Sequence, residues 1–216
     1  MVHLFLIDGL IAALSLLLWY VCFSQYNRRK GDATLRVVES ACLGLGKVTE
    51  VRWFGAHRLE AHLRFTTHWV GDAHVTVRLR PRQVPLNWLF AILRKQKETL
   101  TFEANLDFAP TFQLEVYRHQ WLTEKAELGG DREWMISRPG PIVLTTRKQW
   151  GNELTPVVNT LMSSSGHSLM SVRFRTEAPH LAATVPLEAL SGEESSVAFL
   201  NVLRELAASA SSTSRQ

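Results

Sequence analysis

Histidine is concentrated in one part of the chain, where alternating apolar and polar residues predict a β-hairpin over residues 59–79. Imidazole is the side chain that most often binds zinc or exchanges a proton near neutral pH. When the apolar faces of the two strands are aligned, His62 and His74 become diagonal neighbours on one face, and Glu60 lies opposite Arg78. Cations surround both imidazoles and repel a metal ion, so we expect no metal site. The basic face that results consists of Arg58, Arg64, Arg78 and Arg80.

Acidic side chains mark a second predicted hairpin, formed by residues 100–108 and 112–117. Glu103 and Asp107 alternate with apolar residues on the first strand, and Glu115 does so on the second. Carboxylates that share a sheet face can perform general acid–base chemistry or bind a cation, although a hydrated sheet face has the same composition. His167 adds an imidazole within a serine-rich segment, but adjacency in sequence does not create a catalytic triad. These four residues are the candidates for an enzymatic site.

Motifs with a strong catalytic signal are missing from the sequence. It contains no Walker loop, no G-x-G-x-x-G or G-x-S-x-G turn, no H-E-x-x-H helix and no paired C-x-x-C. The sequence therefore favours a binding protein over an enzyme and predicts no cofactor.

The elements that carry these residues indicate an α+β protein. The 216 residues are 46% hydrophobic and 20% charged, which supports a folded domain and excludes a disordered or fibrous chain. We expect one N-terminal transmembrane helix, followed by a soluble domain of mainly antiparallel sheet, built from hairpins, with three to four helices. Strands are expected at residues 47–54, 59–65, 73–79, 100–108, 112–117, 133–137, 142–146, 170–174 and 181–187. Helices are expected at residues 34–45, 85–97, 150–161 and 191–207.

Residues 2–23 form a continuous apolar stretch whose single formal charge is Asp8. As a helix, this stretch reaches about 33 Å and matches the roughly 30 Å hydrocarbon core of a bilayer. No basic residue precedes it and no small-residue cleavage site follows it, so a retained anchor is predicted rather than a secretory signal peptide. The expected interface residues are Trp19, Tyr20 and Tyr26, followed by a basic stop of Arg28, Arg29 and Lys30. The positive-inside rule then places the N-terminus outside and the rest of the chain in the cytoplasm.

A second apolar segment, residues 85–97, has a distinctive composition. Trp88 and Phe90 lie in a run that is apolar nearly all round a helix, and Arg94, Lys95 and Lys97 follow this run directly. Such a helix suits the headgroup region of a bilayer. A helix buried between the two hairpins would have the same composition, so both interpretations stay open at this point.

Charge is unevenly distributed along the chain. Residues 28–98 contain 14 Lys and Arg against 6 Asp and Glu, whereas residues 99–216 contain 10 against 13. The expected organisation is an anchor with its basic stop over residues 1–30, a soluble domain over residues 31–207 and a flexible tail over residues 208–216. The soluble domain can be divided by charge into a basic part, 31–98, and an acidic part, 99–207. Cys22 and Cys42 fall on opposite sides of the anchor boundary, so we expect no disulfide.

Two functions fit these patterns. The first is a single-pass membrane-anchored accessory or scaffold protein, whose cytoplasmic domain docks on the membrane surface and binds a protein partner. The alternative is a membrane-tethered enzyme that acts on a lipid or a membrane-bound substrate. Membrane lipid and another protein are the expected partners, while nucleic acid and a small-molecule substrate are not expected. An exposed apolar patch, or an unpacked Trp53, Trp69 or Trp121, would favour the scaffold, and carboxylates that converge in a pocket would favour the enzyme.

Overall fold

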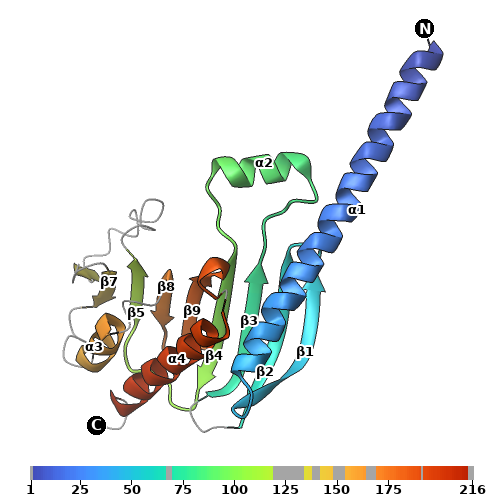
Figure 1. Ribbon diagram of the computed structural model, residues 1–216. Coiled ribbons are helices and arrows are strands. Elements are labelled where there is room, and N and C mark those ends of the chain that lie inside the picture. Colours follow the sequence, from blue (N-terminus) through green and yellow to red (C-terminus); the bar gives the residue numbers. More distant parts are fainter. Residues whose placement is uncertain are drawn as a thin grey trace.

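The chain folds around a nine-stranded antiparallel sheet with the strand order β1-β2-β3-β4-β9-β8-β5-β7-β6 (Figure 1). The computed structural model describes residues 2–66, 70–118, 134–137, 142–147, 154–163, 169–190 and 192–213. The strands are β1 (Gly46–Phe54), β2 (Arg58–Phe65), β3 (Val70–Arg78), β4 (Thr99–Leu106), β5 (Leu114–Arg118), β6 (Trp134–Ser137), β7 (Ile142–Arg147), β8 (Ser171–Phe174) and β9 (Leu181–Pro186). The helices are α1 (Val2–Ala41), α2 (Pro85–Leu93), α3 (Thr155–Ser163), the 3-10 helix η3 (Leu187–Leu190) and α4 (Glu193–Thr213). The predicted α+β class is confirmed.

Helices cover one face of the sheet, and none of the described helices covers the other face. The C-terminal part of α1 and helix α4 lie side by side across the strands (Figure 1), and their apolar side chains meet the apolar residues of the sheet. Leu59, Val75 and Phe102 on the strands and Leu203 and Leu206 on α4 are fully buried there. The alternate residues of β2, β3 and β4 point away from this core and are polar. Period-two alternation in the sequence therefore separates the two faces correctly.

Helix α1 is continuous over its 40 residues. The helix predicted at residues 34–45 is the end of this same helix, and the chain makes no break at residue 30. No proline interrupts residues 2–41, and the chain turns only at residues 42–45, where Gly44 adopts a φ of +83° that favours glycine. The N-terminal part, starting from Leu6, is exposed and has a mean hydropathy of 2.1, so this helix is long and apolar enough to cross a membrane.

The first predicted hairpin forms, but its register differs from our expectation. His62 lies directly opposite His74, Glu60 opposite Thr76 and Arg58 opposite Arg78. The predicted pairing of Glu60 with Arg78 is wrong by two residues. Gly71 and Asp72, which were expected in the loop, belong to β3, so the chain reverses in a shorter connection. A shift of two keeps every side chain on its predicted face, and the apolar pattern therefore cannot distinguish the two registers.

The second predicted hairpin is wrong. Strand β4 pairs with β3 and β9, and β5 pairs with β7 and β8, so β4 and β5 are not neighbours. The β8–β9 hairpin, more than 50 residues further along the chain, inserts between them. Both arrangements place Phe102 and Leu114 in the core, and local alternation does not specify which strand lies alongside. The strands predicted at residues 133–137, 142–146, 170–174 and 181–187 form, and they pair in the antiparallel sheet as β6 with β7 and β8 with β9.

The C-terminal helix is longer than predicted. Helix α4 continues through Thr213, so most of the segment expected as a flexible tail is helical, and Ala210 is buried against the core. Alanine and serine in this segment are compatible with a helix, and the burial of one small side chain extends it. Residues 214–216 lie outside the described part of the chain.

Gly31 of α1 lies against the side chain of Trp53 on β1. A β-carbon added to Gly31 would stand 2.5 Å from Cη2 and 2.9 Å from Cζ2 of Trp53, whereas one added to Gly9 of the same helix would meet nothing within 4 Å. Replacing glycine by alanine inside a helix normally stabilises it by about 0.5–1 kcal/mol. Overpacking of this kind costs about 1–3 kcal/mol. The clash with Trp53 should therefore make alanine at this position destabilising instead of stabilising.

We predict that Gly31→Ala lowers the free energy of unfolding of the domain by about 1–2 kcal/mol. Urea unfolding of the full chain in detergent, followed by tryptophan fluorescence, measures this change. Gly9→Ala is the matched control and should leave the transition in place. A Gly31→Ala protein as stable as the parent would show that α1 does not pack on Trp53 in this way.

Candidate functional site

Helix α2 stands away from the core at one end of the sheet (Figure 1). Pro85 occupies its first turn, where the missing N–H costs nothing, and Ala91 is the one residue of the helix that is buried. Five large apolar side chains of α2 are exposed, with exposed fractions up to 67% at Leu86 and 68% at Leu93; the other three are Leu89, Phe90 and Ile92. The interpretation of this segment as a core helix is therefore wrong. The chain forms an apolar helix without a covering layer of protein in the described residues.

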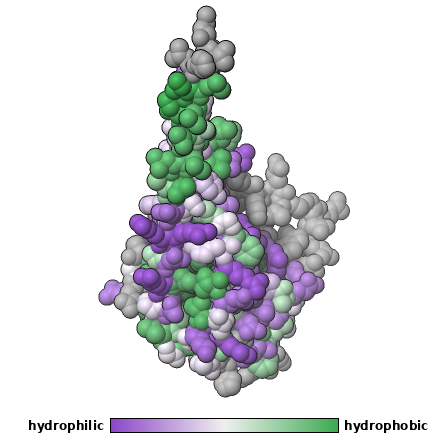
Figure 2. All heavy atoms as spheres, turned by 90° about the vertical axis from the view of Figure 1, so that its right-hand side faces the viewer, coloured by the Kyte–Doolittle hydropathy of each residue, from purple (hydrophilic) through white to green (hydrophobic). Residues whose placement is uncertain are grey.

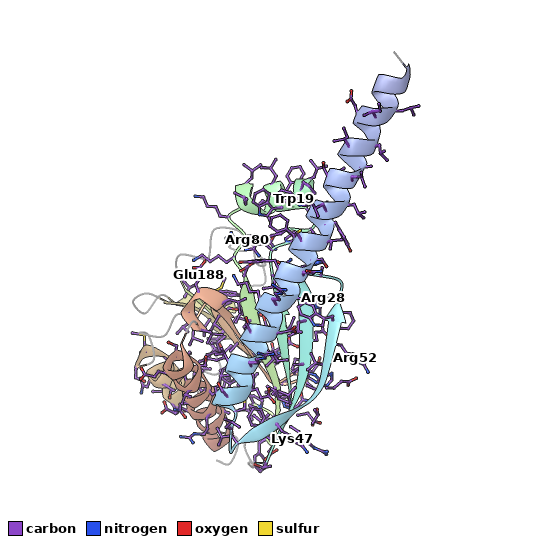
Figure 3. All side chains as sticks on the ribbon, turned by 45° about the vertical axis from the view of Figure 1, so that its right-hand side comes forward. Trp19, Arg28, Lys47, Arg52, Arg80 and Glu188 are labelled. Atoms are coloured by element: carbon purple, nitrogen blue, oxygen red, sulfur yellow. The ribbon has the colours of Figure 1, made fainter. Side chains whose placement is uncertain are left out.

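Trp19 joins α2 to α1. Its ring lies 5.8 Å from the ring of Trp88 on α2 and 4.4 Å from that of Phe23, measured between centroids. Its indole Nε1 donates a hydrogen bond of 2.9 Å to the backbone carbonyl of Arg82, just before α2 begins. Figure 3 shows Trp19 on the side of α1 that faces α2. The exposed apolar part of α1 and the exposed apolar face of α2 are thereby held next to each other.

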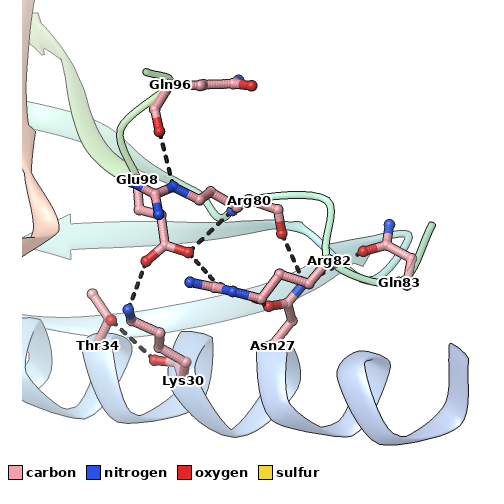
Figure 4. A network of polar contacts seen from close by, with 8 residues as sticks. All are labelled: Asn27, Lys30, Thr34, Arg80, Arg82, Gln83, Gln96 and Glu98. Atoms are coloured by element: carbon pink, nitrogen blue, oxygen red, sulfur yellow. Dashed lines mark hydrogen bonds and ion pairs between the residues drawn. The ribbon is translucent and has the colours of Figure 1, made fainter. Parts of the chain in front are cut away.

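A polar network fixes α1 to the two connections that carry α2 (Figure 4). Asn27 on α1 is completely buried, and its Nδ2 donates to the carbonyl of Arg80 at 3.0 Å, while its Oδ1 accepts from Arg82 at 3.2 Å. On the other side of α2, the carbonyl of Gln96 accepts a hydrogen bond of 2.9 Å from Nε of Arg80. Because these groups come from both flanks of α2, the network sets the position of α2 relative to α1.

Glu98 is the charged centre of this network. Its carboxylate accepts from Nζ of Lys30 at 2.6 Å, from a guanidinium nitrogen of Arg82 at 2.5 Å and from the backbone N–H of Arg80 at 3.1 Å. The side chains of Glu98 and Arg82 are only 9% and 14% exposed. Burial alone would raise the pKa of Glu98, but the hydrogen bonds from Lys30 and Arg80 and the charges of Arg82 and Lys30 lower it from its ordinary value of 4.5.

The predicted interface residues lie at several places around α1 and α2. Tyr20 and Tyr26 are exposed on α1, and the guanidinium of Arg82 stands 5.1 Å from the centroid of the Tyr26 ring. Arg28 and Arg29 are exposed, whereas Lys30 belongs to the Glu98 network. Phe90, Arg94 and Lys95 are exposed at α2, and Lys97 is half-buried.

Asn27, Arg82 and Glu98 were not singled out from the sequence. Each is a common polar residue, and nothing in its local pattern distinguishes burial from exposure. Their sequence separation of 16 to 71 residues means that only the fold brings them together.

The predicted basic face is divided by the structure. Arg58 and Arg78 lie directly opposite each other on the uncovered face of the sheet, and Arg58 forms an ion pair with Glu60 of its own strand. Arg64 lies opposite Asp72 at the far end of β2. Arg80 follows the end of β3, and its Nε donates a hydrogen bond to the carbonyl of Gln96. The hollow around the first pair has a volume of about 340 Å³ and also contains His62 and His74, whose ring centroids are 4.2 Å apart.

The candidate catalytic residues do not converge. Glu103 lies on β4 and Glu115 on β5, and strands β9 and β8 run between them. Glu115 instead accepts a hydrogen bond of 2.7 Å from the hydroxyl of Tyr117 and lies 3.9 Å from Arg173 and Arg175. Burial and this hydrogen bond raise the pKa of Tyr117. His167 lies outside the described residues, and those residues contain no group of three or more His, Cys, Asp or Glu that could hold a metal ion.

The remaining residues singled out from the sequence are placed as follows. Trp53 is partly buried against the core and Gly31, so it is not an unpacked tryptophan. Trp69 and Trp121 lie outside the described residues. Cys22 is exposed on α1, and Cys42 is buried as a free thiol, with a pKa that burial and the nearby Glu39 raise to about 11.

Comparison of the chain with protein-family models and with curated proteins finds no match.

We predict that Glu98→Gln destabilises the fold by about 2–4 kcal/mol at pH 7, because it leaves the nearly buried guanidinium of Arg82 without its carboxylate. The lowered pKa of Glu98 means that its contribution is present above about pH 4.5 and is lost as the pH falls through the pKa of the folded state. Denaturant unfolding of both proteins at several pH values should therefore show a difference that shrinks in acid.

Glu50→Gln is the control, because Glu50 pairs with Arg52 at 2.6 Å on the exposed surface. Its effect should stay within about 0.5 kcal/mol at every pH. A Glu98→Gln protein as stable as the control would contradict the network's contribution.

Proposed function

We propose that this protein is a single-pass membrane-anchored accessory or scaffold protein, whose α+β domain docks on the membrane surface and binds a protein partner. The observation that carries the proposal is the position of α2. An exposed apolar helix is held by Trp19 and the Glu98 network beside the exposed apolar part of a helix long enough to span a bilayer. Two such surfaces side by side on one end of a domain are most simply covered by one membrane.

Apolar burial supplies the energy for docking. In water, the five exposed side chains of α2 and those of α1 from Leu6 to Val21 would leave a large apolar surface uncovered. Soluble proteins rarely expose contiguous apolar patches of this kind. Full burial of one large aliphatic or aromatic side chain contributes about 1.5–3 kcal/mol. Each of the half-exposed side chains of α2 would gain a part of this free energy when the helix enters the interface, and the gains of the five side chains add up.

Charge supports the same placement of the bilayer. Figure 2 shows the protruding helix as a hydrophobic column and a largely hydrophilic surface where this column meets the domain. Arg28 and Arg29 on α1 and Arg94 and Lys95 after α2 are exposed. Each basic group close to an anionic leaflet contributes up to about 1 kcal/mol. The domain would thus rest on the headgroups with α2 in the interface.

The packing of α1 favours a retained anchor over a cleaved signal sequence. Trp19 contacts Trp88, and Asn27 and Lys30 bind the connections around α2 on the same continuous helix. Cleavage after residue 23 would remove Trp19 and leave Trp88 and α2 without this contact. The helix therefore serves the fold of the domain as well as its attachment.

The distribution of positive charge favours a cytoplasmic domain. Arg28, Arg29 and Lys30 follow the apolar stretch, and no Lys or Arg precedes it. In this orientation the acidic part of the domain, residues 99–207, continues the sheet sideways from β3 and lies beside the basic part. A domain held at a fixed height and orientation presents that surface reproducibly, which is what an accessory subunit or scaffold requires.

We predict that α2 lies in lipid when the full chain is reconstituted in nanodiscs. A spin label at Leu89→Cys should collide with lipid-dissolved oxygen and be protected from a water-soluble nickel complex. Cys22 is replaced by serine for this experiment, and the buried thiol of Cys42 does not compete for the label.

Val197→Cys on α4 is the matched control, because its side chain is 40% exposed and that of Leu89 is 49% exposed. The label at residue 197 should show the opposite pattern and be accessible to nickel. Equal accessibility of the two labels to nickel would refute docking through α2. The double variant Arg94→Glu and Lys95→Glu should reduce protection at residue 89 in anionic nanodiscs.

We also predict that a fluorescent protein fused after Gln216 fluoresces in cells, whereas alkaline phosphatase fused at the same point is inactive because it stays in the cytoplasm. Replacing Arg28 and Arg29 by glutamine and adding three lysines after Met1 should shift the population towards the inverted topology. Lys30 is retained because it binds Glu98. Active phosphatase fused to the unaltered chain would overturn the orientation.

A further inference from the structure

The face of the sheet that no described helix covers contains a pair of arginines and a pair of histidines in register. Arg58 lies directly opposite Arg78, and His62 lies directly opposite His74, with Glu60 and Thr76 between the two pairs. Like charges opposite each other on neighbouring strands destabilise a sheet. These pairs form the floor of the 340 Å³ hollow, which extends to Thr101 and Glu103 on β4. Glu60 and Glu103 also line the hollow, so the feature that suits an anion is the opposed pair of guanidinium groups and not the net charge of the lining.

Both guanidinium groups have N–H donors that no described residue accepts. Arg58 uses one terminal nitrogen in the ion pair with Glu60 and lies 5.6 Å from the centroid of the Phe54 ring, which orients its plane. Its Nε is buried and has no hydrogen-bond acceptor among the described residues. Arg78 forms no ion pair with a described carboxylate, because Glu60 is taken by Arg58 and lies on the neighbouring strand.

We propose that this hollow binds a phosphate group between Arg58 and Arg78. A phosphate monoester presents three acceptor oxygens, which match guanidinium donors arriving from two strands together with the hydroxyls of Thr76 and Thr101 that line the same hollow. The bound anion would accept hydrogen bonds from terminal guanidinium nitrogens of Arg58 and Arg78 and separate the two like charges. His74 and Glu103, which are opposite each other in register on β3 and β4, would contact the rest of the ligand.

The location of the hollow allows two sources for the phosphate. Arg58 begins β2 and Arg78 ends β3, so both lie at the end of the strands from which the chain continues to α2 (Figure 1). A lipid headgroup at the membrane surface could reach this end, and so could a phosphorylated molecule in solution. This site goes beyond membrane docking and does not depend on it, because none of its residues belongs to α1 or α2.

Isothermal titration of the full chain in an uncharged detergent tests the proposal with two probes. Inorganic phosphate represents the free ligand, and dioctanoyl phosphatidic acid has the same phosphomonoester on a lipid. We expect binding at one site, with a loss of affinity of at least about tenfold in Arg78→Gln, the factor that corresponds to 1.4 kcal/mol. Preference for the lipid by more than about tenfold would identify a headgroup site, and equal affinity would identify a site for soluble phosphates.

Arg64→Gln is the matched control, because Arg64 lies on β2 and the same face but outside the hollow. Its affinity for both probes should equal that of the parent protein. Arg58→Lys keeps the charge but removes the planar guanidinium with its terminal donors, and it should also weaken binding, which preserves the test if Arg78→Gln fails to fold. The proposal would be overturned if neither probe binds, or if all three variants bind both probes as tightly as the parent does.

Failure of the phosphate site and failure of membrane docking are distinguishable. The Arg94→Glu and Lys95→Glu variant should lose docking in anionic nanodiscs but bind both probes in detergent as the parent does. Arg78→Gln should show the reverse, with the label at residue 89 still protected from nickel.

Discussion

The carboxylate of Glu98 holds the protein together at the point where the apolar helix meets the sheet. It binds Lys30 of α1 on one side and Arg82 and the backbone of Arg80 on the other. A buried ion pair contributes little net stability compared with an apolar contact of the same shape, because both charges lose their hydration. Removing one partner of such a pair lowers the stability far more than the intact pair raises it, because the remaining charge stays buried without a counter-charge. We therefore interpret the network as a device that permits one arrangement of α1 and α2 and penalises the others.

Asn27 completes that constraint. Its amide donates to and accepts from residues of the connection before α2, and its complete burial makes both bonds obligatory. A smooth apolar contact would let α1 rotate or slide along the sheet. Directional hydrogen bonds between a helix and a loop set both its rotation and its height. The contact of Trp19 with Trp88, about two helical turns closer to the N-terminus than Asn27, then follows from the same placement.

The continuity of α1 couples the apolar segment to the domain. At about 1.5 Å per residue, the 40 residues form a rod of roughly 60 Å, of which the C-terminal part packs on the sheet. A flexible linker would let the domain tumble below its attachment point. A single helix that carries both the apolar stretch and the Glu98 contacts transmits a fixed orientation to the whole sheet, including the uncovered face with its arginine and histidine pairs.

The sequence by itself determined the features that depend on local pattern. Alternation identified the two sides of β2, β3 and β4, the apolar stretch before Arg28 indicated an N-terminal helix, and the strands β6, β7, β8 and β9 were also expected near their observed positions. It also identified residues 85–97 as an unusual segment. Tertiary structure alone decided that α2 lies outside the core, because the sequence of an apolar helix has the same composition whether protein or lipid covers the helix.

Tertiary structure also decided the register that sets His62 opposite His74 and the insertion of β8 and β9 between β4 and β5. Local alternation is satisfied equally by a shift of two residues or by an exchange of neighbouring strands, because both leave each side chain on its face. The Glu98 network depends on residues up to 71 positions apart, whose burial is a property of the assembled fold and not of any segment. For this reason the sequence indicated which side chains share a face of a strand or helix, and only the fold determined which side chains of other elements they contact.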